Sequence, residues 1–274
     1  MRALVRLGTM GVLIGALLPM VLATPAQAKP KKKIQTVIAL GFDDADATHW
    51  RAAQIVRKHR MRGTFYINSG DLDQPGKLTS KQVRELARVG QEIGGHTLHH
   101  VRLTDLTAID QRADICADRQ ALLKLKIRVT TFAYPFGALN ADSRNAARFC
   151  GYNAARGVGG LAFDPCDWCA VVEPMRPPQL YAIRTYGSIN DNTRLAELKR
   201  QVTMAERSGG LLPVVIHKVC ARPCGTYSTT EKLLDEFLGW LGQRKKFGTV
   251  VRPLGEHVGG PNRPVPDESE WQRL

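Results

Sequence analysis

The sequence predicts an α/β fold: a single closed or slightly distorted (β/α) barrel of seven to eight βα units. Strand-like and helix-like segments alternate from residue 34 to residue 252, which is typical of a parallel sheet covered by helices. A stretch of about 220 residues suits one barrel of this kind. The polar residues of greatest chemical interest follow predicted strands, where such folds place their active sites.

Short apolar or β-branched runs bounded by turn residues predict the strands. The first run is almost continuously apolar and indicates a buried strand. The predicted strands are residues 34–42, 63–68, 92–95, 129–133, 152–155, 181–185, 211–216 and 249–252. Residues 157–179 are predicted to be irregular.

Helical spacing and capping signals predict the helices. Thr79 and Gln82 form a capping-box pattern at the start of one helix. Apolar residues at helical spacing from Leu106 to Leu123 predict a longer one. The predicted helices are residues 48–59, 79–89, 104–125, 140–150, 191–208 and 228–241.

Both ends of the chain depart from this alternation. Arg2 and Arg6 precede an apolar run that ends in small residues at Ala26 and Ala28, the pattern of a secretory signal. The alternative is a membrane anchor, but the run is shorter than the ~20 residues of a spanning helix. We expect a periplasmic or secreted protein with no membrane span after cleavage. The expected divisions are residues 1–28 (cleaved signal peptide), 29–33 (basic arm), 34–252 (barrel) and 253–274 (a Pro/Gly-rich tail whose order the sequence leaves open).

Composition and charge restrict the class of protein. The 274 residues are 43% hydrophobic and 23% charged, which excludes a disordered chain, a collagen-like repeat and a multi-span membrane protein. The formal net charge of +14 favours an anionic neighbourhood such as a cell envelope. The cations are spread along the sequence, which argues against a nucleic-acid partner.

Six cysteines follow the signal segment, and an even number in an exported chain favours disulfides. They are Cys116, Cys150, Cys166, Cys169, Cys220 and Cys224. We expect Cys116 to pair with Cys150 between two helices, and the other four to pair within or between two loops. The alternative is a zinc site formed by the thiolates of these four.

Asp43 and Asp44 end the first apolar strand. Two adjacent carboxylates repel each other unless one binds a cation, so the pair suits one metal ligand and one general base. The alternative is a turn in which the aspartates cap the following helix.

His96 and His100 follow the strand 92–95. In a helical turn, residues four apart face the same way and hold one metal. By the same geometry His99 points elsewhere, as a neighbouring or surface group. With Asp44, the pair makes a site of two histidines and one carboxylate with open positions for water and substrate.

Two further strand ends carry candidate residues. Residues 132–137 form an aromatic turn built around Pro135, which alone indicates only a rigid loop. His217 closes the strand 211–216, where a satisfied core histidine is the alternative.

Together, these four motifs resemble the polysaccharide deacetylase family, also called the NodB-homology domain or carbohydrate esterase family 4. The resemblance covers roughly residues 34–252. It implies a distorted (β/α) barrel and one divalent metal ion, most commonly Zn²⁺, that acts in removing N- or O-acetyl groups from glycans.

The resemblance also implies roles for individual residues. Asp43 resembles the general base and His217 the general acid. The turn Tyr134-Pro135-Phe136 resembles the one whose backbone N–H, here that of Phe136, binds the oxyanion. The metal ligands it implies are Asp44, His96 and His100.

Two positions depart from the family pattern. The arginine that pairs with the base is replaced by Ala133, and Arg184 or Arg156 are the candidate substitutes. A segment ending in Asp167 and Trp168 loosely resembles a substrate-groove motif that also tunes the acid histidine, although a disulfide loop would contain the same residues.

We therefore expect a monomeric, metal-dependent hydrolase that deacetylates an N-acetylglucosamine-type polymer of the envelope. Tyr134, Pro135, Asp167 and Trp168 are the expected substrate-binding residues, with aromatic rings, Phe136 included, stacking on sugars. One alternative is an impaired homologue that only binds glycan, suggested by the missing arginine. The other is an iron oxygenase with a two-histidine, one-carboxylate site, which leaves Asp43 and His217 without a role.

Overall fold

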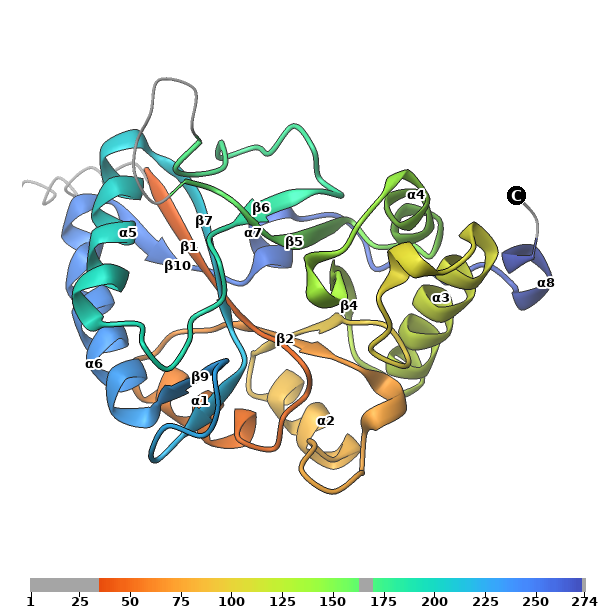
Figure 1. Cartoon of the computed structure of the whole chain (residues 1–274), viewed down its shortest axis with the longest axis horizontal. Helices are drawn as coiled ribbons and strands as arrows, with labels where there is room; N and C mark the ends of the chain where they lie inside the picture. The colour runs from red at the N-terminus through yellow and green to blue at the C-terminus, as the bar shows by residue number, and fades with distance from the viewer. Residues whose placement is uncertain (1–34, 163–169, 273–274) are drawn as a thin grey trace, which may run out of the picture. The chain divides into compact units, whose positions relative to one another are not determined.

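A sheet of eight parallel strands forms the centre of the described chain (Figure 1). The computed structural model describes residues 35–162 and 170–272. The strands are β1 (Thr36–Phe42), β2 (Thr64–Ile67), β3 (Glu92–Gly95), β4 (Val129–Ala133), β5 (Ala154–Gly160), β6 (Ile183–Thr185), β7 (Gly210–Ile216) and β10 (Thr249–Val251). The order is β10-β1-β2-β3-β4-β5-β6, with β7 also paired to β1. This confirms the predicted α/β barrel.

The barrel is distorted at two places, around β1 and between β6 and β7. β7 pairs with the whole of β1, from Thr36↔Gly210 to Phe42↔Ile216. The other side of β1 is shared, because β10 pairs near its start and β2 near its end. Between β6 and β7, no ladder is present in the described chain, and the isolated Glu173–Leu211 bridge spans this seam instead.

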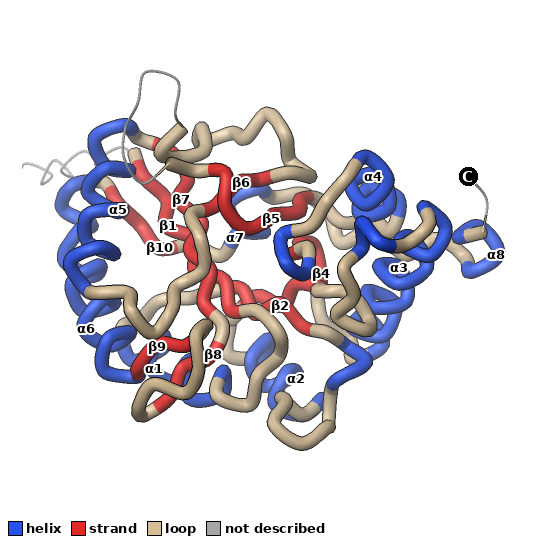
Figure 2. The backbone as a smooth tube through the Cα atoms, in the orientation of Figure 1, coloured by secondary structure: helices blue, strands red, loops and turns tan. Residues whose placement is uncertain are grey.

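Six helices cover the outside of the described sheet (Figure 2). They are α1 (His49–Lys58), α2 (Ser80–Arg88), α3 (Ala108–Lys124), α4 (Ala141–Phe149), α5 (Leu195–Ser208) and α6 (Glu231–Gly242). The capping box predicted for α2 is present, because Thr79 Oγ1 accepts the Gln82 N–H and Gln82 Oε1 accepts the Thr79 N–H. The apolar faces of these helices pack on the strands in one continuous core.

Three predicted boundaries shift for local reasons. α3 begins at Ala108 because the Thr107 side chain caps it, and the 3₁₀ turn η2 (Leu103–Asp105) precedes it. β5 runs from Ala154 to Gly160, later than the predicted 152–155. The chain from residue 228 forms a short ladder before α6, in which β8 (Lys218–Cys220) pairs with β9 (Ser228–Thr230).

The described part of the Pro/Gly-rich tail packs against the barrel. Helix α7 (Leu254–Val258) covers the N-terminal end of the sheet, where the Leu254 N–H donates to Thr64 Oγ1 and the Gly255 N–H to Glu92 Oε2. Helix α8 (Glu268–Trp271) buries Trp271. The tail is therefore part of the fold up to residue 272.

Two disulfides tie loops and helices together. Cys116–Cys150 joins α3 to the end of α4, which confirms the predicted pairing. Cys220–Cys224 closes the turn between β8 and β9, and this bond excludes the four-thiolate zinc site. Cys166 and Cys169 lie outside the described residues, as do the predicted signal peptide and basic arm. Across the residues described, no helix is long and apolar enough to cross a bilayer.

Glu92 gives the stability of this fold a predictable pH dependence. Burial raises the pKa of its carboxyl to about 7, against the opposing effect of hydrogen bonds from Thr131 and the Gly255 N–H. The folded protein therefore keeps a proton that the unfolded chain releases near pH 4.5. The stabilisation is fully present below that pH and is lost as the pH rises through about 7.

We expect Glu92→Gln to remove this dependence. The free energy of unfolding of wild type relative to Glu92→Gln should fall by roughly 1–3 kcal/mol between pH 4 and pH 8, as measured by urea unfolding at several pH values. A difference between the two proteins that stays constant with pH would contradict a raised pKa at Glu92.

Candidate active site

The predicted site residues meet at the C-terminal ends of the strands. A cavity of about 600 Å³ is lined by Asp43 and Asp44 after β1, His96 and His100 after β3, Tyr134 and Phe136 after β4, and His217 after β7. This is the end of a parallel barrel where several loops converge. Asp167 and Trp168 lie outside the described residues.

Asp43 lies at the base of the cavity, paired with Arg156. Its side chain is buried, and the Arg156 guanidinium donates to its Oδ1. Burial alone would raise the pKa of Asp43, but the charge of Arg156, together with those of His96 and His217, outweighs it and lowers the pKa below its ordinary value. Asp43 is therefore held as a carboxylate with a fixed orientation.

Arg156 substitutes for the arginine missing at position 133. It lies on β5 directly across the ladder from Ala133 on β4, so the guanidinium reaches Asp43 from the neighbouring strand. Its guanidinium carbon lies 4.5 Å from the centre of the Tyr66 ring. A Cβ at Gly41 would come within 3.2 Å of the same guanidinium, so the glycine leaves the room that Arg156 needs. Arg184, the other candidate, pairs with Glu173 instead.

Asp44, His96 and His100 form a cluster able to hold a metal ion. One ligand atom from each lies within 4.8 Å of the other two. The Nε2 atoms of His96 and His100 lie 3.2 and 3.1 Å from Asp44 Oδ1, a buried oxygen without a hydrogen bond in the described chain. Burial would raise the pKa of Asp44, but the two histidine side chains outweigh it and hold the pKa well below its usual range.

The loop that presents the two histidines differs from the prediction. Residues 96–100 form no helical turn, and the histidines converge because Thr97 and His100 adopt positive φ values of 69° and 52°. The two histidines therefore come together as expected, but without the helical turn on which the prediction was based. His99 points away, as predicted: its side chain is 65% exposed and its Nδ1 lies 2.5 Å from Asp114.

Hydrogen bonds to the backbone orient His96 for metal binding. Its Nδ1–H donates to the Ala133 carbonyl at 2.7 Å, which leaves Nε2 unprotonated toward Asp44 when the ring is neutral. The backbone N–H of His96 donates to the Ile67 carbonyl and to Asp118 Oδ2. Burial acts to lower the pKa of His96, but the Asp44 and Asp43 carboxylates outweigh it and raise the pKa.

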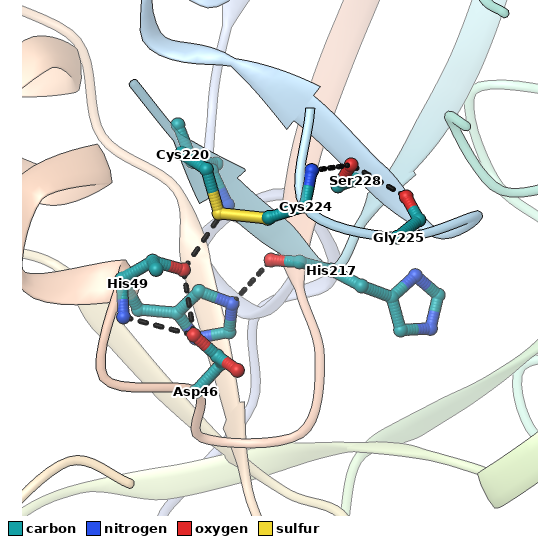
Figure 3. The surroundings of a disulfide bond; sticks show 9 residues. Asp46, His49, His217, Cys220, Cys224, Gly225 and Ser228 are labelled. Atoms are coloured by element: carbon teal, nitrogen blue, oxygen red, sulfur yellow. Dashed lines mark hydrogen bonds between the residues drawn. A yellow bond between two sulfur atoms is a disulfide. The ribbon is translucent and has the colours of Figure 1, made fainter. Parts of the chain in front are cut away.

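His217 is held by its backbone on the other side of the cavity. His49 Nε2 donates to the His217 carbonyl oxygen at 2.6 Å, as Figure 3 shows. Burial lowers the pKa of His49, which favours its neutral form. The loop beyond His217 is closed by Cys220–Cys224, and Tyr227 from this loop lies 5.5 Å from the His217 ring, between ring centres.

The turn after β4 places Phe136 at the edge of the cavity. Phe136 has φ 60° and ψ 7°, and its side chain is 56% exposed. The turn is closed by hydrogen bonds from Gly137 N–H to the Tyr134 carbonyl and from Ala138 N–H to the Pro135 carbonyl. Neither bond uses the Phe136 N–H.

Tyr134 and Pro135 support this turn from below. Tyr134 has no exposed surface, and its hydroxyl donates to the Tyr181 carbonyl. Its ring is thus unable to stack on a sugar, which corrects that part of the prediction. Pro135 is also buried, and it is absent from the described lining of the cavity.

The structure adds lining residues that the sequence did not single out. Tyr227 is 61% exposed and stands beside His217. Arg102 places its guanidinium 4.9 Å from the centre of the Phe136 ring, and Lys218 follows His217. Lys218 begins β8 and Tyr227 precedes β9, on either side of the loop that Cys220–Cys224 closes, and the sequence contains no positional signal for this region beyond the cysteines.

Comparisons with known proteins agree with this architecture. The family model for polysaccharide deacetylases matches residues 30–155. The protein YxkH of Bacillus subtilis (strain 168), named as a polysaccharide deacetylase, is 26% identical over 136 residues, which are 47% of this chain and 49% of that protein. The chain therefore spans about half the length of this curated relative.

Two solved structures share the fold at 16% sequence identity. The peptidoglycan N-acetylglucosamine deacetylase Bc1960 has a TM-score of 0.56, over 85% of this chain and 92% of that one. The carbohydrate esterase domain of a multidomain xylanase from the hindgut metagenome of Trinervitermes trinervoides has a TM-score of 0.54, over 83% and 94%. These likenesses establish the barrel.

The Asp43–Arg156 pair makes a stability prediction that can be tested without a substrate. We expect Arg156→Met to lower the free energy of unfolding by about 3–5 kcal/mol, because it leaves a buried carboxylate unpaired. The double variant Ala133→Arg/Arg156→Met supplies a guanidinium from position 133, which faces Arg156 across the ladder. It should recover part of the lost free energy of unfolding. Urea unfolding at pH 7 measures both. Equal free energies of unfolding of wild type and Arg156→Met would show that the ion pair does not stabilise the fold.

Proposed function

We propose that the chain is a member of the polysaccharide deacetylase family, whose model matches residues 30–155, and that it is a metal-dependent hydrolase that removes acetyl groups from an extracellular or cell-envelope glycan. The preferred reaction is N-deacetylation of an N-acetylglucosamine-type polymer. The observation that carries the proposal is one cavity that contains a potential metal site between an ionised carboxylate and a histidine.

The donor set fits a divalent metal ion, most simply Zn²⁺. Asp44, His96 and His100 would hold it, since two imidazoles and one carboxylate are a catalytic zinc set that leaves a position open. When bound, the ion supplies Lewis acidity, which polarises the acetyl carbonyl and lowers the pKa of water. The hydrogen bond from His96 to the Ala133 carbonyl fixes the tautomer that such binding needs.

Asp43 is suited to be the general base. Arg156 keeps it ionised and oriented, so it accepts the proton of the attacking water as that oxygen bonds to the acetyl carbon. Its backbone N–H donates to the Ile216 carbonyl at the end of β7, which ties the base to the strand that precedes His217.

Two groups act on the opposite parts of the reacting amide. The Phe136 N–H, held in a rigid turn, donates to the oxyanion that develops on the carbonyl oxygen. His217 then gives a proton to the departing nitrogen as the C–N bond breaks, so that acetate and a free amine are the products.

The cavity edge favours a sugar substrate. Of the four exposed large hydrophobic side chains in the described chain, Phe136 and Tyr227 line this cavity. Flat aromatic surfaces at a cavity mouth suit stacking on pyranose rings. Export to the envelope, proposed from the N-terminal pattern, would bring the enzyme to such polymers.

The alternatives lose support from particular residues. The impaired, glycan-binding homologue was suggested by Ala133, but Arg156 supplies a guanidinium to Asp43 from the next strand. The iron oxygenase assigns no role to that ion pair or to His217.

The proposal predicts metal-dependent release of acetate. The purified protein, supplied with Zn²⁺, should release acetate from N-acetylglucosamine oligomers or N-acetylated cell-wall glycan, and chelation should abolish the release until Zn²⁺ is restored. An enzymatic acetate assay on a panel that includes acetylated xylan separates N- from O-deacetylation. Absence of acetate from every glycan in the panel would overturn the proposed activity.

Single substitutions should separate metal binding from proton transfer. Asp44→Ala and His96→Ala should lose bound zinc, measured by elemental analysis, together with activity. Asp43→Asn should keep zinc and lose about 10²–10⁴-fold in turnover, because it lacks a base. His99→Ala, beside the site but turned away, is the control and should keep both. Full activity in Asp43→Asn would disprove its role as base.

A further inference from the structure

The positive charge of the described chain gathers at the end of the barrel opposite the active-site cavity. In a parallel barrel, segments that lead from helix to strand lie at this N-terminal end. Four of them, residues 57–62, 84–91, 124–128 and 243–248, contain twelve Lys or Arg residues and one acid, Glu85. The cations are Arg57, Lys58, Arg60, Arg62, Arg84, Arg88, Lys124, Lys126, Arg128, Arg244, Lys245 and Lys246. Cations that are spread in sequence therefore converge in space.

Helix stabilisation explains only part of this pattern. Arg57, Lys58, Arg88 and Lys124 lie in the last turns of helices, where a positive charge interacts favourably with the helix dipole. Arg62, Lys126 and Arg128 lie beyond the helix ends. Stabilisation of a helix end therefore does not explain the charges of these three residues.

Some of these cations line a groove between α2, the α3–β4 loop and α7. The groove encloses about 720 Å³, and its lining contains five exposed cationic side chains and two acids, Glu92 and Glu256. The cations are Arg62, Arg84, Arg88, Lys126 and Arg128. Burial raises the pKa of Glu92 to about 7, which weakens its negative charge at neutral pH.

Two of the five cations are available for a ligand. Arg62 pairs with Glu256 and Arg88 with Glu85, and Arg128 donates to the Gly260 carbonyl. Arg84 and Lys126 form no ion pair with any residue in the described ranges. They project from α2 and from the α3–β4 loop, so they face one groove from two elements.

We propose that this groove binds a linear polyanion whose repeating units carry phosphate or carboxylate groups. Guanidinium groups form paired hydrogen bonds to both anions, and five cationic side chains from several segments around one groove suit a chain of anions better than a single ion. The site is separate from the catalytic cavity, and at the opposite end of the strands. A bound polymer would hold the protein on an anionic matrix and leave the cavity accessible.

The groove fits a polymer strand better than a membrane surface or a nucleic acid. Surface-bound membrane proteins insert exposed apolar side chains, and single-stranded nucleic acids stack on aromatic ones. The exposed large hydrophobic residues of the described chain are Phe136, Leu180, Tyr227 and Phe247, and none of them lines this groove.

Binding of fluorescently labelled polyphosphate and polyglutamate to the purified chain tests the proposal. Fluorescence anisotropy at 50 and 150 mM NaCl should show binding to at least one polymer, weaker at the higher salt because the contact is ionic. We expect the double variant Arg84→Gln/Lys126→Gln to bind about tenfold or more weakly, with an unchanged circular dichroism spectrum. The polymer that binds more tightly identifies the anion.

A matched control changes the same charge elsewhere. Lys81→Gln/Lys232→Gln alters two exposed lysines in the first turns of α2 and α6, and it should keep wild-type affinity. If both double variants bound the polymer equally weakly, the effect would depend on net charge alone, and the proposed binding groove would be overturned. Absence of binding to both polymers would overturn it too, as would tighter binding to phosphatidylglycerol vesicles than to either polymer. None of these measurements depends on deacetylase activity.

Discussion

The buried ion pair between Asp43 and Arg156 constrains the structure more than any other contact in the site. A carboxylate without exposed surface at the end of β1 is unfavourable unless a cation is also buried beside it. That cation comes from β5, so the pair joins two strands that are not neighbours in the sheet. The Tyr66 ring packs against the guanidinium, and Gly41 leaves room for it because it has no side chain. The position of Asp43 and the packing of β1 against β5 are therefore linked.

The same constraint explains how charges are arranged in the cavity. Asp43 and Asp44 are adjacent and would repel each other, but they face different partners: Arg156 for Asp43, and His96 and His100 for Asp44. Each carboxylate is stabilised as an anion by its own neighbours, and the pKa of each is lowered. One backbone turn thus holds two adjacent carboxylates, because their partners come from two other strands, β5 and β3.

Sequence patterns predicted the barrel, most element boundaries and the three residues of the Asp44–His96–His100 cluster, because these depend on local periodicity and on strand ends. They did not decide between Arg156 and Arg184, since that choice depends on the register of β4 against β5. The His96–His100 pair was identified from its spacing, but two positive φ angles, and no helical turn, bring the rings together. Tyr227 and the burial of Tyr134 depend on how the β8–β9 loop and Tyr181 pack, which one sequence does not specify.

The fold places acidic and basic residues at opposite ends of the barrel, a separation that the net charge of +14 does not reveal. The loop after β1 supplies Asp43, Asp44 and Asp46 without a cation, as the proposed metal site and general base require. The helix-to-strand segments at the other end supply cations almost without acids. If cations were as dense around the cavity, they would compete with a divalent ion for Asp44. The described lining of the cavity contains two cations, Arg102 and Lys218, against five in the groove at the other end. The basic character of the protein is therefore better explained by the proposed binding of a polyanion than by the proposed reaction.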